Sequence, residues 1–193
     1  MHAFRLVLTL LLATLLLGCN KPANWHSTDI SGMMPDLEFN LLGPDGNAFD
    51  ARSLHGKTAL IFFGFTSCPD VCPTTLTQLS VVIKKMGAQA NDVQIVLVSV
   101  DPDRDTPEVM KTYTASFGPW LLGLTGPEQA LTQLRETYGV YAAMESSDSK
   151  GTYNVMHSAA IFVFDDQGRA RLLISDVNDS DAVVSDLKQL IDQ

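Results

Sequence analysis

The chain has 193 residues, of which 46% are hydrophobic and 18% are charged. This length and composition suit one well-buried globular domain and exclude a disordered chain. The formal net charge is −9, and no run of Lys and Arg is dense enough to attract a phosphate backbone, so no nucleic-acid partner is expected.

The N-terminus has the pattern of an export signal. Arg5 precedes a largely apolar region of twelve residues, Leu6 to Leu17, which Gly18 and Cys19 follow. This run is shorter than the roughly 18 residues of a spanning helix, and a cysteine at this place resembles the lipidation site of bacterial lipoproteins. We therefore expect a signal peptide at 1–18, a lipidated Cys19, a polar tether over 19–33, and a membrane-anchored, extracytoplasmic location at the periplasmic face. An uncleaved short anchor and a signal cleaved without lipidation are the alternatives.

Beyond the tether, strand and helix patterns alternate through one expected domain, residues 34–193. Apolar runs predict strands, and apolar residues three and four apart, after Pro, Ser or Thr, predict helices. In chain order we first expect a hairpin with strands at Leu37–Leu42 and Ala48–Phe49, a strand at Thr58–Thr66 and a helix from Pro73 to about Lys85. A strand at Val93–Val100, a helix from Pro107 to about Phe117, a short strand and a helix from Pro127 to Tyr138 follow. The chain then ends with a hairpin, whose strands are Ala159–Phe164 and Arg171–Ile174, and a helix from Ser180 to Ile191.

This order predicts an α/β domain with three α/β/α layers around a mixed sheet. A C-terminal hairpin followed by a helix is the ending that a thioredoxin-like fold requires, and the first hairpin would be an N-terminal extension of that fold. Periodicity alone supports only the α/β class. The thioredoxin-like assignment rests on the cysteine motif that follows the first long strand.

Two cysteines, Cys68 and Cys72, lie between the strand that ends at Thr66 and the helix that starts at Pro73. Pro69 and Pro73 each disfavour helical geometry at the cysteine before them. The N-terminal end of a helix favours a thiolate, so we expect lowered thiol pKa values here. In an oxidising compartment the pair forms a disulfide unless something keeps it reduced or metal-bound. A purely structural disulfide is the alternative, but a bond across three residues constrains little chain entropy.

His157 is the third candidate ligand, because it precedes the strand that begins at Ala159. In a thioredoxin-like order, the segment that enters this strand lies beside the redox loop. Two thiolates and one imidazole form a soft, three-coordinate set that suits Cu(I) and tolerates Cu(II), whereas zinc normally takes a fourth ligand. A structural role is the alternative for a single histidine. We expect His2, His26 and His55 to be solvated.

A carboxylate-rich loop follows the second long strand and contains Asp101, Asp103 and Asp105. Such a set would suit a hard cation. The interleaved prolines and the Thr106-Pro107 pair instead favour turns and helix capping. We therefore expect no functional metal at this loop.

Three segments together resemble the Sco (SenC) copper proteins of cytochrome oxidase assembly. They are FFGFTSCPDVCPTTL at 62–76, VLVSVDPDRDTPEVMKTY at 96–113 and HSAAIFVFDDQGR at 157–169. The resemblance implies a thioredoxin fold with an N-terminal extension, and copper bound by the two motif cysteines and the distal histidine, here Cys68, Cys72 and His157. It also implies delivery of copper to the binuclear centre of oxidase subunit II, or reduction of the cysteines of that centre. Many relatives have Asp directly before the histidine, where this chain has Met156, and a change beside a ligand affects metal affinity.

The residues and the resemblance favour a metallochaperone that turns over no small substrate. Its expected partners are cytochrome c oxidase subunit II or a similar copper enzyme, a copper donor protein, and the membrane that holds the lipid anchor. A thiol–disulfide oxidoreductase is the main alternative, since a lowered thiol pKa serves both roles. A histidine ligand and the C-x3-C spacing favour the metal. A peroxiredoxin-like peroxidase fits poorly, because the cysteine loop contains no arginine.

Overall fold

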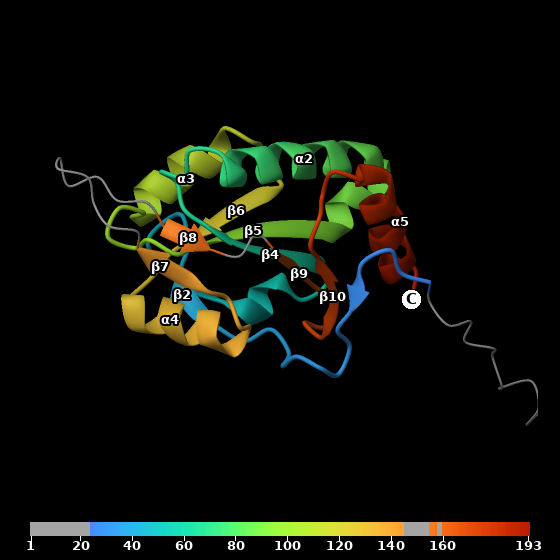
Figure 1. The fold of residues 1–193 in the computed structure, drawn as a ribbon, viewed down its shortest axis with the longest axis horizontal. Coiled ribbons are helices and arrows are strands. Elements are labelled where there is room, and N and C mark those ends of the chain that lie inside the picture. The colour runs from blue at the N-terminus through green and yellow to red at the C-terminus, as the bar shows by residue number, and fades with distance from the viewer. Residues whose placement is uncertain (1–23, 145–154, 158–159) are drawn as a thin grey trace, which may run out of the picture.

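A mixed sheet runs through the centre of the protein (Figure 1). The structure is a computed structural model that describes residues 24–144, 155–157 and 160–193. The strands of the sheet are β1 (Thr28–Asp29), β4 (Thr58–Gly64), β5 (Val93–Ser99), β6 (Leu121–Leu124), β9 (Ile161–Phe164) and β10 (Ala170–Ile174). In the described residues their order across the sheet is β1-β10-β9-β4-β5-β6. Strands β4, β5 and β6 are parallel, whereas β9 is antiparallel to β4, β10 to β9, and β1 to β10.

The central strands β4 and β5 are apolar because both faces of the sheet are covered. All seven residues of β4 are buried, and β5 pairs with them in parallel up to Gly64 and Ser99. Neighbouring parallel strands end at the same edge of the sheet. The Val100 N–H accordingly donates to the Gly64 carbonyl at 2.9 Å. The loops that leave these two strands therefore start side by side, and one of them carries both cysteines.

Helices cover the two faces of the sheet (Figure 1). They are α2 (Val71–Met86), α3 (Pro107–Ala115), α4 (Glu128–Thr137) and α5 (Ser180–Ile191), with short 3-10 helices η1 (Ala51–Leu54) and η2 (Gly87–Asp92). Helices α2 and α3 lie along one face and α4 lies on the other, while α5 packs against α2. The three layers, and the final β9-β10-α5 unit, confirm the predicted thioredoxin-like α/β/α fold.

Two hairpins lie outside the main sheet. Strands β2 (Asn40–Leu42) and β3 (Ala48–Asp50) form the predicted N-terminal hairpin. Leu42 and Thr125, the residue after β6, connect this hairpin to the main sheet through two backbone hydrogen bonds of 2.7 and 3.1 Å. Strands β7 (Ala142–Met144) and β8 (Val155–His157) form a second hairpin. The sequence did not predict it, because strands of three residues are too short to show a period. The connection between β7 and β8, residues 145–154, is outside the described residues.

The folded unit starts before residue 34, where the sequence placed the end of the tether. Strand β1 pairs with β10, and Ile30 after it is buried. The backbone N–H groups of His26 and Ser27 donate to the carboxylate of Asp186 on α5, at 2.9 and 2.8 Å. This segment therefore packs on the domain, because a buried carboxylate and a strand pairing hold it there.

The predicted signal peptide at 1–18 and the predicted lipidation site Cys19 are outside the described residues. Among the helices of the described ranges, none combines the length and the apolar character needed to cross a bilayer. The lipid anchor stays a prediction.

Candidate metal centre

The loop between β4 and α2 brings Cys68 and Cys72 together. The Cys68 N–H donates to the Phe65 carbonyl at 3.3 Å, so the chain turns directly after the strand. Helix α2 begins at Val71, two residues before the predicted start at Pro73, which puts Cys72 in its first turn. Neither cysteine is part of a disulfide in the described structure, and Cys68 is half-buried whereas Cys72 is fully buried.

The sulfur of Cys68 occupies the position of a helix cap. Asp70 precedes α2, but its side chain accepts no capping hydrogen bond. The Cys72 N–H, in the first turn, donates to Cys68 Sγ at 3.3 Å instead. An N-cap side chain normally accepts from the second or third residue of a helix. The start of α2 therefore orients the Cys68 sulfur toward the second cysteine.

The surroundings of Cys72 correct one prediction. Burial raises the pKa of the Cys72 thiol, and the adjacent Cys68 thiol and the charge of Asp105 raise it further, against a hydrogen bond from the Phe65 backbone. The sequence instead predicts that the helix N-terminus lowers the pKa of this thiol. Desolvation outweighs the helix end here, because the side chain is fully buried. The metal-free Cys72 thiol therefore keeps its proton.

Gly64, the last residue of β4, leaves the space that Cys72 occupies. A Cβ atom at position 64 would lie 3.0 Å from Cys72 Sγ and 3.0 Å from Leu97 Cδ1, both too close for a normal contact. Gly64 was not among the site residues predicted from the sequence. Its signal was a glycine inside the apolar run Thr58–Thr66, since such a glycine marks a close approach of other atoms.

Asp105 fastens the cysteine loop to the neighbouring strand. Its carboxylate is fully buried and accepts hydrogen bonds from Thr66 Oγ1 at 2.6 Å, from the Thr66 N–H at 3.2 Å, and from Ser99 Oγ at 2.7 Å. Burial raises the pKa of Asp105, although these hydrogen bonds oppose the shift. We predicted turns and capping for this loop, and Thr106 does cap α3 by accepting from the Val109 N–H. The clamp on Thr66 was not predicted.

Arg104 brings a positive charge to the cysteine loop from the next loop. Its guanidinium carbon lies 5.7 Å from the centre of the Phe65 ring, and its Nε pairs with the carboxylate of Asp101. The cysteine loop itself contains no arginine, but Arg104 reaches it from another loop. The absence of an arginine from the loop therefore counts less against a peroxidase than the sequence predicts. The pairing with Asp101 and the full burial of Cys72 still distinguish the site from one with an exposed, arginine-activated thiol.

The backbone of His157 ends β8, opposite Ala142 of β7. This hairpin and the β4–α2 loop lie toward the same end of the molecule, where α3 also lies (Figure 1). The imidazole itself is outside the described part of the structure. Among the side chains that are described, no three His, Cys, Asp or Glu residues form a metal-binding group. Of the predicted ligands, the structure thus brings together Cys68 and Cys72.

The other histidines have different surroundings. His26 Nδ1 lies 3.1 Å from an oxygen of Asp186, although 55% of the His26 side chain is exposed. His55 lies in the turn after η1 and faces Gly168, whose added Cβ would be 3.2 Å from His55 Nε2. His2 is outside the described residues.

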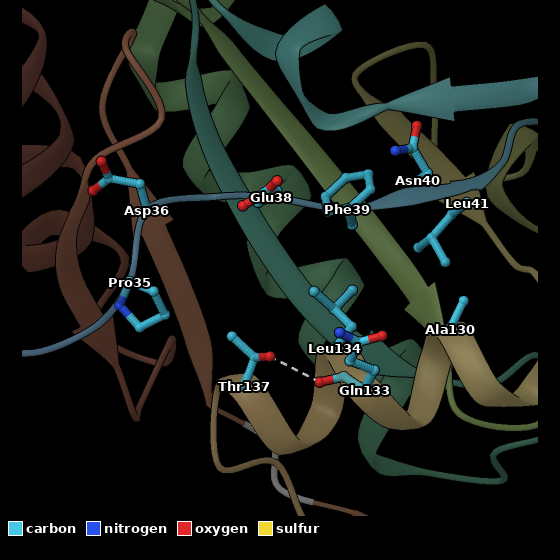
Figure 2. Close-up of a pocket in the computed structure, with 10 residues that line it drawn as sticks. All are labelled: Pro35, Asp36, Glu38, Phe39, Asn40, Leu41, Ala130, Gln133, Leu134 and Thr137. Carbon is cyan, nitrogen blue, oxygen red and sulfur yellow. Dashed lines mark hydrogen bonds between the residues drawn. The ribbon is translucent and has the colours of Figure 1, made fainter.

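A cavity of about 480 Å³ lies between α4 and the chain that leads into β2 (Figure 2). Asp36 and Glu38 line one side of this cavity, and Gln133 and Thr137 of α4 line the opposite side. The residues that line it in the described structure include no cysteine and no histidine. Cys68 and Cys72 therefore do not line this cavity.

The fold and this loop define a class of protein, a thioredoxin-like domain with two cysteines at its strand-to-helix junction. The family model SCO1/SenC matches residues 32–192, and the chain belongs to this family. A SCO2-like protein of Rickettsia prowazekii is 37% identical over 132 residues, which are 68% of this chain and 64% of that protein. The chain thus spans less than two thirds of the length of this relative.

Two solved structures are similar along most of the chain. The ScoI protein of Bradyrhizobium japonicum with copper bound is 39% identical, with a TM-score of 0.74, and the match covers 81% of this chain and 99% of that one. The apo Sco1 protein of Thermus thermophilus is 37% identical, with a TM-score of 0.78, and the match covers 89% of this chain and all of that one (100%).

Proposed function

We propose that this protein is a copper metallochaperone that binds one copper ion through Cys68, Cys72 and His157. The observation that carries the proposal is the loop itself, where two thiols that form no disulfide lie together at the start of α2. The copper-bound structure of the Bradyrhizobium relative supports it. The recipient is the binuclear copper centre of cytochrome c oxidase subunit II or of a similar copper enzyme, and a separate donor protein supplies the metal.

The donor set fits copper as a cargo. Thiolate sulfur and imidazole nitrogen are ligands that bind copper more readily than they bind hard cations. Loading removes the thiol protons, including the one that burial keeps on Cys72. Copper then passes from these thiolates to thiolates of the recipient by ligand exchange, with no change of oxidation state. The half-buried Cys68 is the sulfur that an incoming ligand reaches first, and the buried Cys72 is released last.

The proposed location follows from the N-terminus. A lipid on Cys19 would hold the domain at the extracytoplasmic, periplasmic face of a bacterial membrane. The short apolar run before it and the cysteine that ends it support this location. An oxidase subunit that exposes its copper centre on that face is then within reach.

A thiol–disulfide oxidoreductase is the second candidate. The observation that favours it is the position of Cys68 Sγ, which accepts a hydrogen bond from the Cys72 N–H at 3.3 Å and also interacts with the Cys72 thiol. In this role the pair gives up two electrons and two protons and becomes a disulfide, while a disulfide of the recipient centre becomes two thiols.

One experiment separates the two roles. The full-length chain, reduced and loaded with one Cu(I), is mixed with a metal-free, reduced copper domain of oxidase subunit II, and the metal on each protein is measured after separation. Transfer of copper supports the chaperone. The metal-free, reduced chain is mixed in parallel with the oxidised copper domain. Rapid disulfide exchange there, without copper transfer in the first mixture, moves the function to the oxidoreductase.

A variant sharpens this comparison. His157→Ala should slow or abolish copper loading but leave disulfide exchange intact, because the exchange needs only the two sulfurs. Copper loading and transfer at the wild-type level in this variant would remove His157 from the site.

A further inference from the structure

Residues 35–41 form one wall of the cavity in Figure 2, which we call the α4 groove. Exposed and buried residues alternate along this wall: Asp36, Glu38 and Asn40 are exposed, and Leu37, Phe39 and Leu41 are buried. A period of two is that of an extended chain, in which side chains two residues apart lie on the same side, about 7 Å from one another. The carboxylates of Asp36 and Glu38 therefore follow one another along the groove.

The base of the α4 groove is apolar. Phe39, Leu41 and Leu134 line it, and all three are buried. The polar groups of Gln133 and Thr137 lie on the α4 side, where the Thr137 hydroxyl donates to the Gln133 carbonyl at 2.9 Å. Lys and Arg lay an alkyl stem along apolar surface and keep the charged end in water. A groove with an apolar base and a carboxylate rim suits such side chains.

The charge at the α4 groove is negative and has no partner of opposite sign. No Lys and no Arg is among the described residues that line it. Neither Asp36 nor Glu38 forms an ion pair with a basic residue of the described ranges. Arg135, the basic residue of α4, pairs with Glu128 at 2.9 Å instead. A concave surface with charge of one sign attracts a ligand of the opposite sign.

The two walls of the α4 groove are held in place. The Leu37 N–H donates to the Gly168 carbonyl at 2.7 Å, which fixes the extended wall to the turn between β9 and β10. The hydroxyl of Tyr138, directly after α4, donates to the Asp36 carbonyl at 2.9 Å and joins the two walls. A groove that exists before binding saves a ligand the cost of ordering it.

We propose that the α4 groove binds an extended, basic segment of a partner protein, with two Lys or Arg side chains, two residues apart, on Asp36 and Glu38. The spacing of the two carboxylates matches that of alternate side chains on an extended partner. The site goes beyond the copper function, since neither cysteine lines the groove and binding there needs no metal. Helix α4 leads through Tyr138 to β7, whose Ala142 pairs with His157. A partner held in the groove is therefore beside the hairpin that carries the third proposed ligand.

The test uses the full-length, metal-free chain, and the probe is the peptide acetyl-Ala-Lys-Ala-Lys-Ala-amide. Titration with this peptide should shift the backbone amide NMR signals of Phe39, Leu41 and Gln133 at the groove. Raising the salt concentration from about 0.02 M to about 0.3 M should weaken binding, because exposed charges are screened. The same peptide with Glu in place of Lys should not bind.

Glu136→Gln is the matched control for Glu38→Gln, because Glu136 is exposed on α4 but does not line the groove. Glu38→Gln and Asp36→Asn should each weaken the peptide affinity by about twofold to fivefold, the effect of one exposed ion pair. Glu136→Gln should keep the wild-type affinity. An equal loss in Glu38→Gln and Glu136→Gln, signal shifts spread over carboxylates elsewhere, or no binding of the peptide overturns the inference. Copper binding by the same chain is measured separately, so each of these results leaves the proposed function standing.

Discussion

Cys68 and Cys72 lie in different surroundings, although only three residues separate them. Cys72 is fully buried, and burial raises the pKa of its thiol, whereas Cys68 is half-buried. A thiol reagent must reach the sulfur and attacks through the thiolate. In the reduced, metal-free chain, iodoacetamide should therefore alkylate Cys68 about tenfold faster than Cys72 or more. Peptide mass spectrometry over a time course measures both rates in one sample, and a faster reaction at Cys72 would contradict the described burial.

The space beside Cys72 gives a second prediction at the residue scale. In Gly64→Ala, the new methyl group would meet Cys72 Sγ and Leu97 Cδ1 at 3.0 Å each. Overpacking of this kind costs about 1–3 kcal/mol of unfolding free energy. Because one displaced atom is a proposed ligand, copper affinity should fall as well. Urea unfolding of the metal-free chain and a Cu(I) competition titration measure the two effects.

Gly43→Ala is the matched control for this substitution. Its added Cβ would have its nearest atoms at 3.4 to 3.7 Å, which are ordinary contacts. This variant should stay close to wild type in both measurements. Equal behaviour of Gly64→Ala and Gly43→Ala would show that Cys72 has room to move.

The cysteine pair could be predicted from the sequence, but the residues around it could not. The spacing of Cys68 and Cys72 and the prolines beside them are local features. Asp105 reaches the cysteine loop only because β4 and β5 end at one edge of the sheet. The raised pKa of the Cys72 thiol has the same origin, since burial depends on the whole fold.

At the scale of elements, Asp105 joins the ends of β4 and β5 to the start of α3. In Asp105→Ala, the donors of Thr66 and Ser99 lose their buried acceptor, which costs about 1–3 kcal/mol of unfolding free energy. Hydrogen exchange of the Thr66 N–H should become faster in this variant, because the cysteine loop separates from β5. Asp105→Asn keeps the size and one acceptor oxygen and should show a smaller effect. Exchange at Thr66 as slow as in wild type in Asp105→Ala would contradict the clamp.

The long elements could be predicted well from their periodicity. Helix α5 has the expected limits, Ser180 and Ile191, and α2 begins two residues before the expected start at Pro73. Strand β1 and the β7–β8 hairpin were missed, because strands of two or three residues are defined by their partners. The tether was drawn too long for the same reason, since polar residues before β1 gain their structure from Asp186 on α5.

At the scale of the whole molecule, two buried carboxylates make the unfolding free energy depend on pH in the acid range. Burial alone would raise the pKa of Asp165 and Asp186, but hydrogen bonds to each outweigh it and lower both from 3.8. Their contribution is therefore fully present above the unfolded pKa and is lost as the pH falls through the folded values. The unfolding free energy should decrease as the pH is lowered below about 4. The contribution of Asp105 to the unfolding free energy has the opposite sign, because its pKa is raised in the folded state. That contribution is present below the unfolded pKa and is lost as the pH rises through the folded pKa.

Asp186→Asn identifies one source of this acid sensitivity. The variant keeps the shape but lacks the charge that accepts from His26 and Ser27, so it should be less stable near pH 7 and lose less stability in acid. Asp181→Asn, at an exposed ion pair on the same helix, is the control and should change stability by about 1 kcal/mol at most. Unfolding free energies measured from pH 2 to pH 7 test both. A slope for Asp186→Asn as steep as that of wild type would assign the effect to other groups.

The most direct test of the central claim is the copper stoichiometry and affinity of the reduced, metal-free, full-length chain, with Cys68→Ala, Cys72→Ala and His157→Ala beside it. His55→Ala is the control, because that residue lies in a turn after η1. The account predicts one copper per wild-type chain and per His55→Ala chain, loss of stable binding in both cysteine variants, and an affinity lower by about tenfold or more in His157→Ala. Wild-type binding in any of the three site variants would contradict the proposed ligand set.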